Sequence, residues 1–167
     1  DEVEWKPTPE GLVLNNDFYG GNFKGIIEKM DYIASLGVTT IYLSPVFDAY
    51  SNHKYDTGDY ETVDEMFGGN KAFDLLVDEC EKRDMRIILD GVFNHTGSDS
   101  VYFNKYGNYD SVGAFLGKKS PYYTWYEFTE FPKYNSWWGI ETLPETNEDE
   151  PSFNEFINGE GGVIKYW

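Results

Sequence analysis

The feature that most constrains this chain is a pair of helical apolar patterns, each followed by a short apolar run that is typical of a β-strand. Residues Lys24–Leu36 carry apolar side chains at helical spacing, Gly37 ends the pattern, and the β-branched run Val38–Leu43 follows. A second helix, with Asn70 as its expected N-cap, precedes the strand-like run Met85–Leu89. Strand, helix and strand at this spacing form a right-handed unit with parallel strands. The sequence therefore predicts an α/β fold with two buried parallel strands.

The connection between the first strand and the second helix, residues Ser44–Gly69, is unusually long for a βα loop. It leaves the carboxyl end of a strand, which is where α/β proteins bind ligands. Within it, His53–Tyr60 combines a histidine, two acids and two tyrosines. Tyrosine rings can stack on the apolar face of a sugar while acids accept hydrogen bonds from its hydroxyls. Taken alone, however, this motif favours a solvated polar turn.

A second polar motif, Asp90–His95, directly follows the second apolar strand. A charged residue ends that strand, and an Asn-His pair lies just beyond it. Two interpretations carry equal weight on spacing alone. Either the motif is a ligand site, or Asp90 is a buried hydrogen-bonding partner and His95 a core histidine.

The chain changes character after His95. Nine of the seventeen residues from 122 to 138 are aromatic, and residues 127–160 hold nine acids and one lysine. A final short helix is expected over Pro151–Trp167.

In the whole chain, 30 acids against 13 bases give a net charge of −17, which argues against nucleic acid or anionic lipid as a partner. The charge favours a neutral ligand, and the surplus of rings predicts that some of them face it.

Several other classes of site are excluded by the residues present. Cys80 is the only cysteine and falls in an apolar helical pattern, which predicts a buried thiol and excludes an intramolecular disulfide. Two histidines without an H-E-x-x-H motif argue against a catalytic transition metal. Gly20–Gly25 lacks the spacing of a dinucleotide-binding loop. No apolar run approaches the ~18 residues of a membrane span, and the acidic start Asp1–Glu4 is unlike a signal peptide.

Four stretches, in order along the chain, carry a resemblance to a known family. They are Phe18–Ile26, Gly37–Phe47 with the following Ser51–Tyr60, Asp90–His95 and Leu143–Asn147. They resemble the opening of the first barrel helix, the second barrel strand with its loop, and the first and fifth conserved regions of the α-amylase family of glycoside hydrolases. Within that family, they are most similar to the neopullulanase, cyclomaltodextrinase and maltogenic amylase branch.

The resemblance implies a fold of class α/β, specifically part of a (β/α)8 TIM barrel. It implies the second and third barrel strands with their helices over residues 1–95, and an aromatic-rich domain B excursion over residues 96–150. Residues 151–167 would then begin the next barrel helix. The catalytic carboxylates of the family lie at the ends of the fourth, fifth and seventh strands, so none is expected before Trp167. By the same comparison, the chain is expected to be a segment of a larger barrel, the remainder of which would be its partner.

The resemblance also implies roles for individual residues. Tyr55 would stack on the glucose ring at the −1 subsite, His95 would hydrogen-bond the 6-hydroxyl of that sugar, and Asp56 would border the same subsite. Asp90 would brace the fourth-strand arginine and nucleophile as structural support. Trp137 and Trp138 would supply further sugar platforms, while other rings of the same run would pack domain B.

Calcium is the one cofactor that the resemblance implies. Asn94 would be a ligand in those relatives that keep the ion of domain B, and oxygen ligands suit calcium. The chain has Asn22 where the branch often has the aspartate of a G-G-D calcium motif. That departure puts a second calcium site in doubt.

The function implied by the resemblance is that of a retaining α-glucan hydrolase. Such an enzyme cleaves α-1,4 and also α-1,6 glucosidic bonds in maltodextrins, cyclodextrins or pullulan through a glycosyl-enzyme intermediate. The isolated 167-residue chain is expected to be inactive. Two alternatives stay open at this stage: a non-catalytic carbohydrate-binding or structural α/β segment, and a glucan transferase of the same family.

Overall fold

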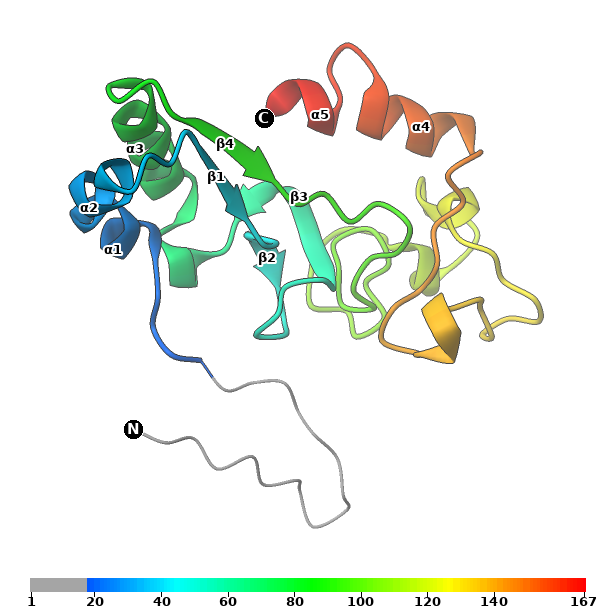
Figure 1. The fold of residues 1–167 in the computed structure, drawn as a ribbon. Helices are drawn as coiled ribbons and strands as arrows, with labels where there is room; N and C mark the ends of the chain where they lie inside the picture. The colour runs from blue at the N-terminus through cyan, green and yellow to red at the C-terminus, as the bar shows by residue number, and fades with distance from the viewer. Residues whose placement is uncertain (1–17) are drawn as a thin grey trace.

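The computed structural model describes residues 18–167, so the acidic start Asp1–Glu4 lies outside the described residues. Figure 1 shows helices grouped beside two parallel strands, a long looped region, and two short helices at the carboxyl end. The elements are α1 Phe23–Glu28, α2 Met30–Ser35, β1 Thr40–Leu43, β2 Phe47–Ala49, β3 Thr57–Val63, α3 Gly69–Glu81, β4 Arg86–Leu89, α4 Pro151–Asn158 and α5 Val163–Tyr166.

The predicted βαβ unit is confirmed. Strands β1 and β4 pair in parallel, with Thr40 opposite Arg86 and Leu43 opposite Leu89. Helix α3 connects the two strands and presents Phe73, Leu76 and Cys80 as its buried face. Cys80 is therefore the buried free thiol that its apolar surroundings predict.

The expectation that both strands are fully buried is wrong. Tyr42 of β1 is 58% exposed and Ile88 of β4 is 52% exposed. Helices α1 to α3 lie beside the small sheet in Figure 1. Among residues 18–167 no third strand joins β1 and β4, and alternate side chains of the pair have nothing packed over them.

Two helix boundaries differ from the predicted ones. The helix predicted over Lys24–Leu36 divides into α1 and α2 at Lys29, whose φ of −106° and ψ of 4° depart from helical geometry. The N-cap of α3 is Gly68, not Asn70. The Asn70 side chain instead accepts a hydrogen bond from Val63 N at 2.7 Å and donates one to Glu61 O at 3.1 Å. Asn70 thus secures the end of β3 and is unavailable as a cap.

The final helix is also interrupted, because α4 ends at Asn158 and α5 begins at Val163. The intervening turn is tight. A Cβ atom at Gly162 would lie 2.7 Å from the carbonyl oxygen of Phe156 and 2.9 Å from that of Ile157. The turn therefore requires glycine, and it separates the two helices where the apolar pattern alone predicted one.

The long connection after β1 folds into an antiparallel hairpin of β2 and β3, in which Asp48 lies opposite Asp59. The interpretation of His53–Tyr60 as a solvated polar turn is wrong, because Lys54, Asp56 and Tyr60 within it are buried. Their burial follows from the packing of the hairpin against the residues after β4, described below. Most of the segment is buried, while His53 and Tyr55 stay exposed.

Residues 96–150 contain short 3-10 turns and isolated bridges but neither an α-helix nor a β-strand. Aromatic rings hold this region together: Phe103 lies 4.8 Å from Tyr126 and 4.7 Å from Tyr134 between ring centroids. Many of the aromatic rings of this region therefore pack against one another in the core. The division of the chain into domains at residues 95 and 150 stays a prediction.

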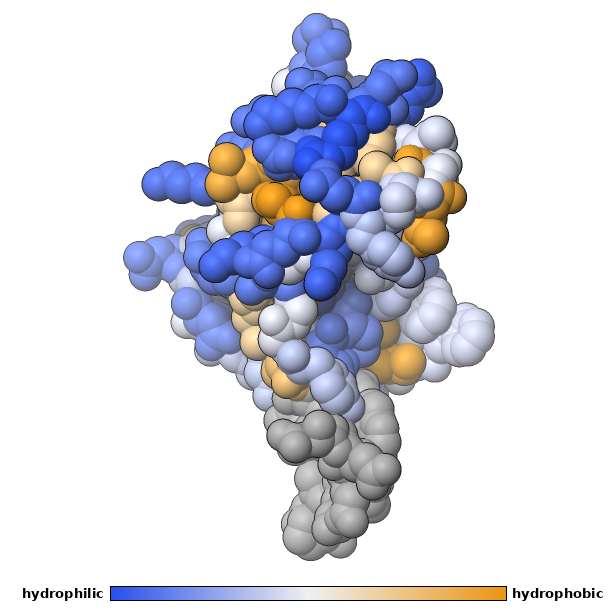
Figure 2. Space-filling view, turned by 60° about the vertical axis from the view of Figure 1, so that its left-hand side comes forward, coloured by the Kyte–Doolittle hydropathy of each residue, from blue (hydrophilic) through white to orange (hydrophobic). Residues whose placement is uncertain are grey.

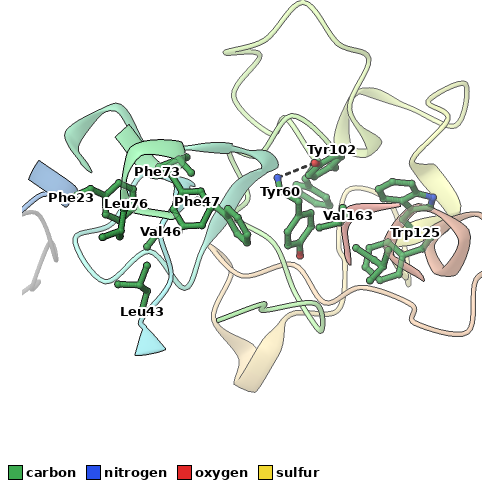
Figure 3. Packing of buried hydrophobic residues seen from close by; sticks show 14 of the residues in the cluster. Phe23, Leu43, Val46, Phe47, Tyr60, Phe73, Leu76, Tyr102, Trp125 and Val163 are labelled. Carbon is green, nitrogen blue, oxygen red and sulfur yellow. Dashed lines mark hydrogen bonds between the residues drawn. The ribbon is translucent and has the colours of Figure 1, made fainter. Parts of the chain in front are cut away.

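Tyr60 connects the two ends of the core. Figure 3 shows it between the Phe47 side of the core and Trp125, with a hydrogen bond between its backbone N–H and the Tyr102 hydroxyl. Its own hydroxyl donates to Val92 O at 2.6 Å and lies 3.3 Å from His95 O. Burial raises the pKa of Tyr60, so the hydroxyl stays protonated as a donor.

The face seen in Figure 2 is mostly hydrophilic, with apolar side chains showing between ridges of hydrophilic ones. Within residues 18–167, none of the helices has the length and apolar character needed to cross a bilayer.

Replacement of Tyr60 by phenylalanine tests this connection. We expect Tyr60→Phe to lower the free energy of unfolding by about 1–3 kcal/mol, because the Val92 carbonyl loses its donor in a partly buried position. Chemical denaturation of the complete protein measures the change. Tyr32→Phe, at an exposed position on α2, is the matched control and is expected to leave stability unchanged.

Candidate functional site

The predicted residues Tyr55, Asp90 and His95 come together beyond the carboxyl ends of β1 and β4. Asp90 directly follows β4, and its Oδ2 accepts a hydrogen bond from the Tyr42 hydroxyl. The Tyr55 hydroxyl lies 3.4 Å from the same oxygen. His95 contacts Tyr55 through its ring nitrogen Nε2, which lies 3.1 Å from the Tyr55 carbonyl oxygen. We call Tyr42, Tyr55, Asp90 and His95 the Tyr55 cluster.

Tyr42 was not predicted as a site residue. The hydrogen bond to Asp90 is the main reason that the pKa of Tyr42 rises to about 12, so the phenol is protonated at neutral pH and donates to the carboxylate. Tyr42 lies opposite Ile88 in the parallel register, two residues before Asp90. The sequence shows only that Tyr42 lies near the carboxyl end of the first strand. The strand register is needed to see that it lies close to Asp90.

The tautomer of His95 follows from its contacts. A carbonyl oxygen only accepts hydrogen bonds, so the nitrogen that faces Tyr55 O carries the proton. The other nitrogen, Nδ1, is buried and has no hydrogen-bond partner among the described residues. Burial is the largest cause that lowers the pKa of His95 from its ordinary value, which keeps the ring neutral near pH 7. Nδ1 is then an unused acceptor.

The backbone around His95 is held from two sides. Tyr60 donates to the carbonyl of Val92 from the hairpin. On the other side, Thr146 Oγ1 donates to Phe93 O at 2.6 Å, and Thr146 N donates to Asn94 O at 3.1 Å. The predicted stretch Leu143–Asn147 therefore supports the predicted stretch Asp90–His95 directly.

Tyr55 is held by the residues on either side of it. Lys54 is buried with a φ of +62°, and its Nζ donates to Ala49 O at 2.7 Å and to Asp64 Oδ2 at 2.5 Å. On the other side, the Asp56 carboxylate accepts hydrogen bonds from Ser51 N at 3.1 Å and from the Ser51 hydroxyl. With both neighbours fixed, the partly exposed Tyr55 ring has a defined position.

The contacts of Asp56 stabilise the loop that carries it. Its side chain is 8% exposed, and both carboxylate oxygens accept from Ser51. The predicted role of Asp56 at the border of a sugar subsite stays a prediction. Lys54 and Asp64, which the sequence did not single out, are equally important for placing Tyr55.

The two predicted sugar platforms continue from His95. The ring of Trp137 lies 5.2 Å from the His95 ring, and Trp138 stacks on Trp137 at 4.7 Å with an interplanar angle of 7°. Trp138 is 83% exposed and has a φ of +54°, a region that costs a non-glycine residue about 1–2 kcal/mol. A large ring is thus displayed to solvent at an energetic cost.

The predicted calcium ligands are less clearly arranged. Asn22 caps α1, because its Oδ1 accepts from Gly25 N at 2.9 Å. Gly20–Gly25 therefore leads into α1, with Asn22 as its N-cap. Within residues 18–167 no group of three His, Cys, Asp or Glu side chains converges on a metal position. A calcium site at Asn94 would depend on amide and carbonyl oxygens, and it stays a prediction.

Comparison with known proteins agrees with the ordered motifs. Residues 5–161 match the model of the α-amylase catalytic domain. The chain belongs to the α-amylase family. It is 45% identical over 173 residues to an amylopullulanase of Thermoanaerobacterium saccharolyticum, which covers 96% of this chain and 13% of that protein. It is 40% identical over 169 residues to an intracellular maltogenic amylase of Bacillus subtilis, covering 99% of this chain and 26% of that protein.

Solved structures of the α-amylase family share the fold. A debranching enzyme from Nostoc punctiforme superposes with a TM-score of 0.78 at 35% identity, covering 96% of this chain and 32% of that one. The βαβ unit of β1, α3 and β4 is accordingly part of the (β/α)8 barrel that the sequence predicted. The chain spans well under half the length of each of these relatives.

The buried, neutral state of His95 predicts a loss of stability in acid. Because burial lowers its folded-state pKa, the unfolded chain binds a proton that the folded chain does not once the pH falls below about 6.5. The contribution of His95 to the free energy of unfolding therefore decreases as the pH falls through about 6.5. We expect the decrease in stability with falling pH to be shallower in His95→Gln, measured by urea denaturation of the complete protein at each pH.

The control for this experiment is His53→Gln, which removes an exposed histidine. Titration of the His95 ring by NMR gives a second, direct measurement in the wild-type protein. A His95 pKa at or above the ordinary value of about 6.5 would contradict the assignment of a buried neutral ring.

Proposed function

We propose that the protein containing this chain is a retaining α-glucan hydrolase. Its substrates are α-1,4 and α-1,6 glucosidic bonds in maltodextrins, cyclodextrins or pullulan. The nucleophile and the general acid are expected outside the 167 residues, and the chain supplies one wall of the substrate-binding site. The family membership and the names of the amylopullulanase and maltogenic amylase relatives support this class of substrate.

The observation that carries the proposal is the arrangement of the Tyr55 cluster. A tyrosine ring, a carboxylate and a buried neutral histidine meet at the carboxyl ends of parallel barrel strands, where TIM-barrel enzymes bind substrate. The Tyr55 ring is 42% exposed and offers an apolar face for a pyranose. His95 is 4% exposed and supports Tyr55 through the contact of Nε2 with its carbonyl oxygen. Because Nδ1 is buried, a hydrogen bond from His95 to a sugar hydroxyl stays a prediction. These groups bind and orient a neutral sugar without transferring a proton.

Asp90 acts as support in this proposal. Its Oδ2 already accepts from Tyr42 and lies within reach of the Tyr55 hydroxyl, so the carboxylate holds both rings in place. Both contacts fall on Oδ2 and connect the carboxylate to the two tyrosines, so we assign Asp90 a positioning role.

Trp137 and Trp138 extend the same surface. Their parallel stack begins at His95 and ends at a ring whose outer face is open. We assign them to further glucosyl residues of a longer substrate, because a fixed indole face is a good platform for the C–H face of a sugar.

The complete protein and the isolated 167-residue chain provide the first test. We expect the complete protein to release reducing sugar from pullulan and maltodextrins, and the isolated chain to release none. Measurable hydrolysis by the purified 167-residue chain would place the catalytic carboxylates within it and contradict this part of the proposal. Analysis of the products separates hydrolysis from glucan transfer.

Substitution of Tyr55 gives a second test. We expect Tyr55→Ala to lower kcat/KM on maltotriose roughly 5- to 30-fold, which corresponds to about 1–2 kcal/mol of lost stacking. Tyr55→Phe keeps the ring and should retain most of the activity. Tyr32→Ala removes an equally large exposed ring on α2 and serves as the matched control. Equal activity of Tyr55→Ala and Tyr32→Ala would exclude Tyr55 as a platform.

A further inference from the structure

A cavity lies near the Tyr55 cluster but is lined by other residues. It has a volume of about 330 Å³, at the lower end of the range of small-ligand sites. Its lining residues are Tyr50, Asp56, Ser98, Asp99, Tyr106, Asn108 and Thr142. We call this the Tyr50 cavity. None of Tyr55, Asp90 and His95 belongs to it.

Two exposed tyrosines are among the residues that line the Tyr50 cavity. Tyr50 is 70% exposed and Tyr106 is 60% exposed, although both come from segments that are otherwise packed against the core. Tyr50 follows β2 directly, and Tyr106 belongs to the turned segment after Asn104. Two separate parts of the chain therefore bring tyrosine rings to one cavity.

The inner side of the cavity is polar and buried. Ser98 is 3% exposed and Asp56 is 8% exposed. Gly97 lets Asp99 and Asp56 approach each other, because a Cβ atom at this position would lie 2.6 Å from Asp99 Oδ1 and 2.7 Å from Asp56 O. Asn108 adds an amide that can both donate and accept.

The charge of the cavity excludes anions. Asp99 is half-buried, and burial, followed by the field of Asp56 and Asp48, raises its pKa. The cation in its surroundings is Lys54, which is committed to Asp64. A phosphate or a nucleotide would be repelled here.

The carboxylates of the cavity do not form a metal site either. Across the described part of the chain, residues 18–167, no three acid, histidine or cysteine side chains converge closely enough to hold an ion. Exposed tyrosine rings together with hydroxyl, amide and carboxylate groups in one cavity match a neutral polyhydroxylated ring instead. Sugars use both features at once, through stacking and hydrogen bonding.

We propose that the Tyr50 cavity binds a glucosyl residue of an α-glucan. The sugar ring stacks on Tyr50 and Tyr106, and its hydroxyls donate to Asp99 and exchange hydrogen bonds with Asn108. The choice of glucan rests on the proposed function, whereas the cavity and its lining do not. The consequence is a binding site for the polymer in addition to the Tyr55 cluster.

Affinity electrophoresis of the complete protein in gels containing soluble starch or pullulan tests this proposal. We expect the wild type to be retarded, and the double variant Tyr50→Ala with Tyr106→Ala to bind roughly tenfold more weakly. The matched control is Tyr19→Ala with Tyr32→Ala, because these tyrosines are 70% and 63% exposed and lie outside the cavity. Asp99→Asn, which leaves both rings in place, is expected to weaken binding as well.

Each outcome decides the proposal. Equal retardation of the cavity variant and the control, or no retardation of the wild type, would overturn it. If the double variant does not fold by circular dichroism, Asp99→Asn alone decides. Hydrolysis by the wild type is assayed separately, so starch binding without hydrolysis would refute the proposed function and leave this site standing.

Discussion

The ion pair between Lys54 and Asp64 is the interaction on which the candidate site depends most. Its two side chains are 2% and 7% exposed, and Asp64 also accepts from the backbone of Met66 at the turn after β3. Removing either partner would leave a buried charge uncompensated, which typically costs about 3–5 kcal/mol. Because Lys54 precedes Tyr55 in a left-handed conformation, the pair also determines where the Tyr55 ring points. The same ion pair therefore contributes both to the stability of the hairpin and to the geometry of the site.

The sequence predicted the parts of this molecule that depend on local periodicity or on ordered motifs. The βαβ unit, the buried thiol of Cys80 and the meeting of Tyr55, Asp90 and His95 follow from apolar spacing and from the rule that parallel strands end at one edge. The break at Lys29 and the loss of Asn70 as a cap were not predictable in this way. Asn70 is lost as a cap because the backbone of Val63 and Glu61 binds its side chain, whereas nothing in the structure explains the break at Lys29.

The hairpin shows the same limit for charged residues. His53–Tyr60 contains acids and a lysine, so its composition favoured solvent, yet Lys54 and Asp56 are buried. What the composition could not show is that each has a partner at the correct distance, Asp64 for Lys54 and Ser51 for Asp56. Buried polar groups are tolerated when they are paired, and pairing depends on tertiary contacts. Tyr42 was not predicted for a related reason: its partner, Asp90, follows a different strand, β4.

The exposed face of the β1 and β4 pair is the surface that the rest of an α-amylase family barrel would cover. Tyr42 and Ile88 project from the same face of the sheet, since they are direct partners in the parallel register. Tyr42 is the donor that orients Asp90, so the open face and the candidate site share one residue. Strands that complete the barrel would cover Ile88 and surround the Tyr42 hydrogen bond with protein rather than water. A hydrogen bond to a carboxylate becomes stronger when water is excluded, so completion of the barrel would tighten the site that this chain already positions.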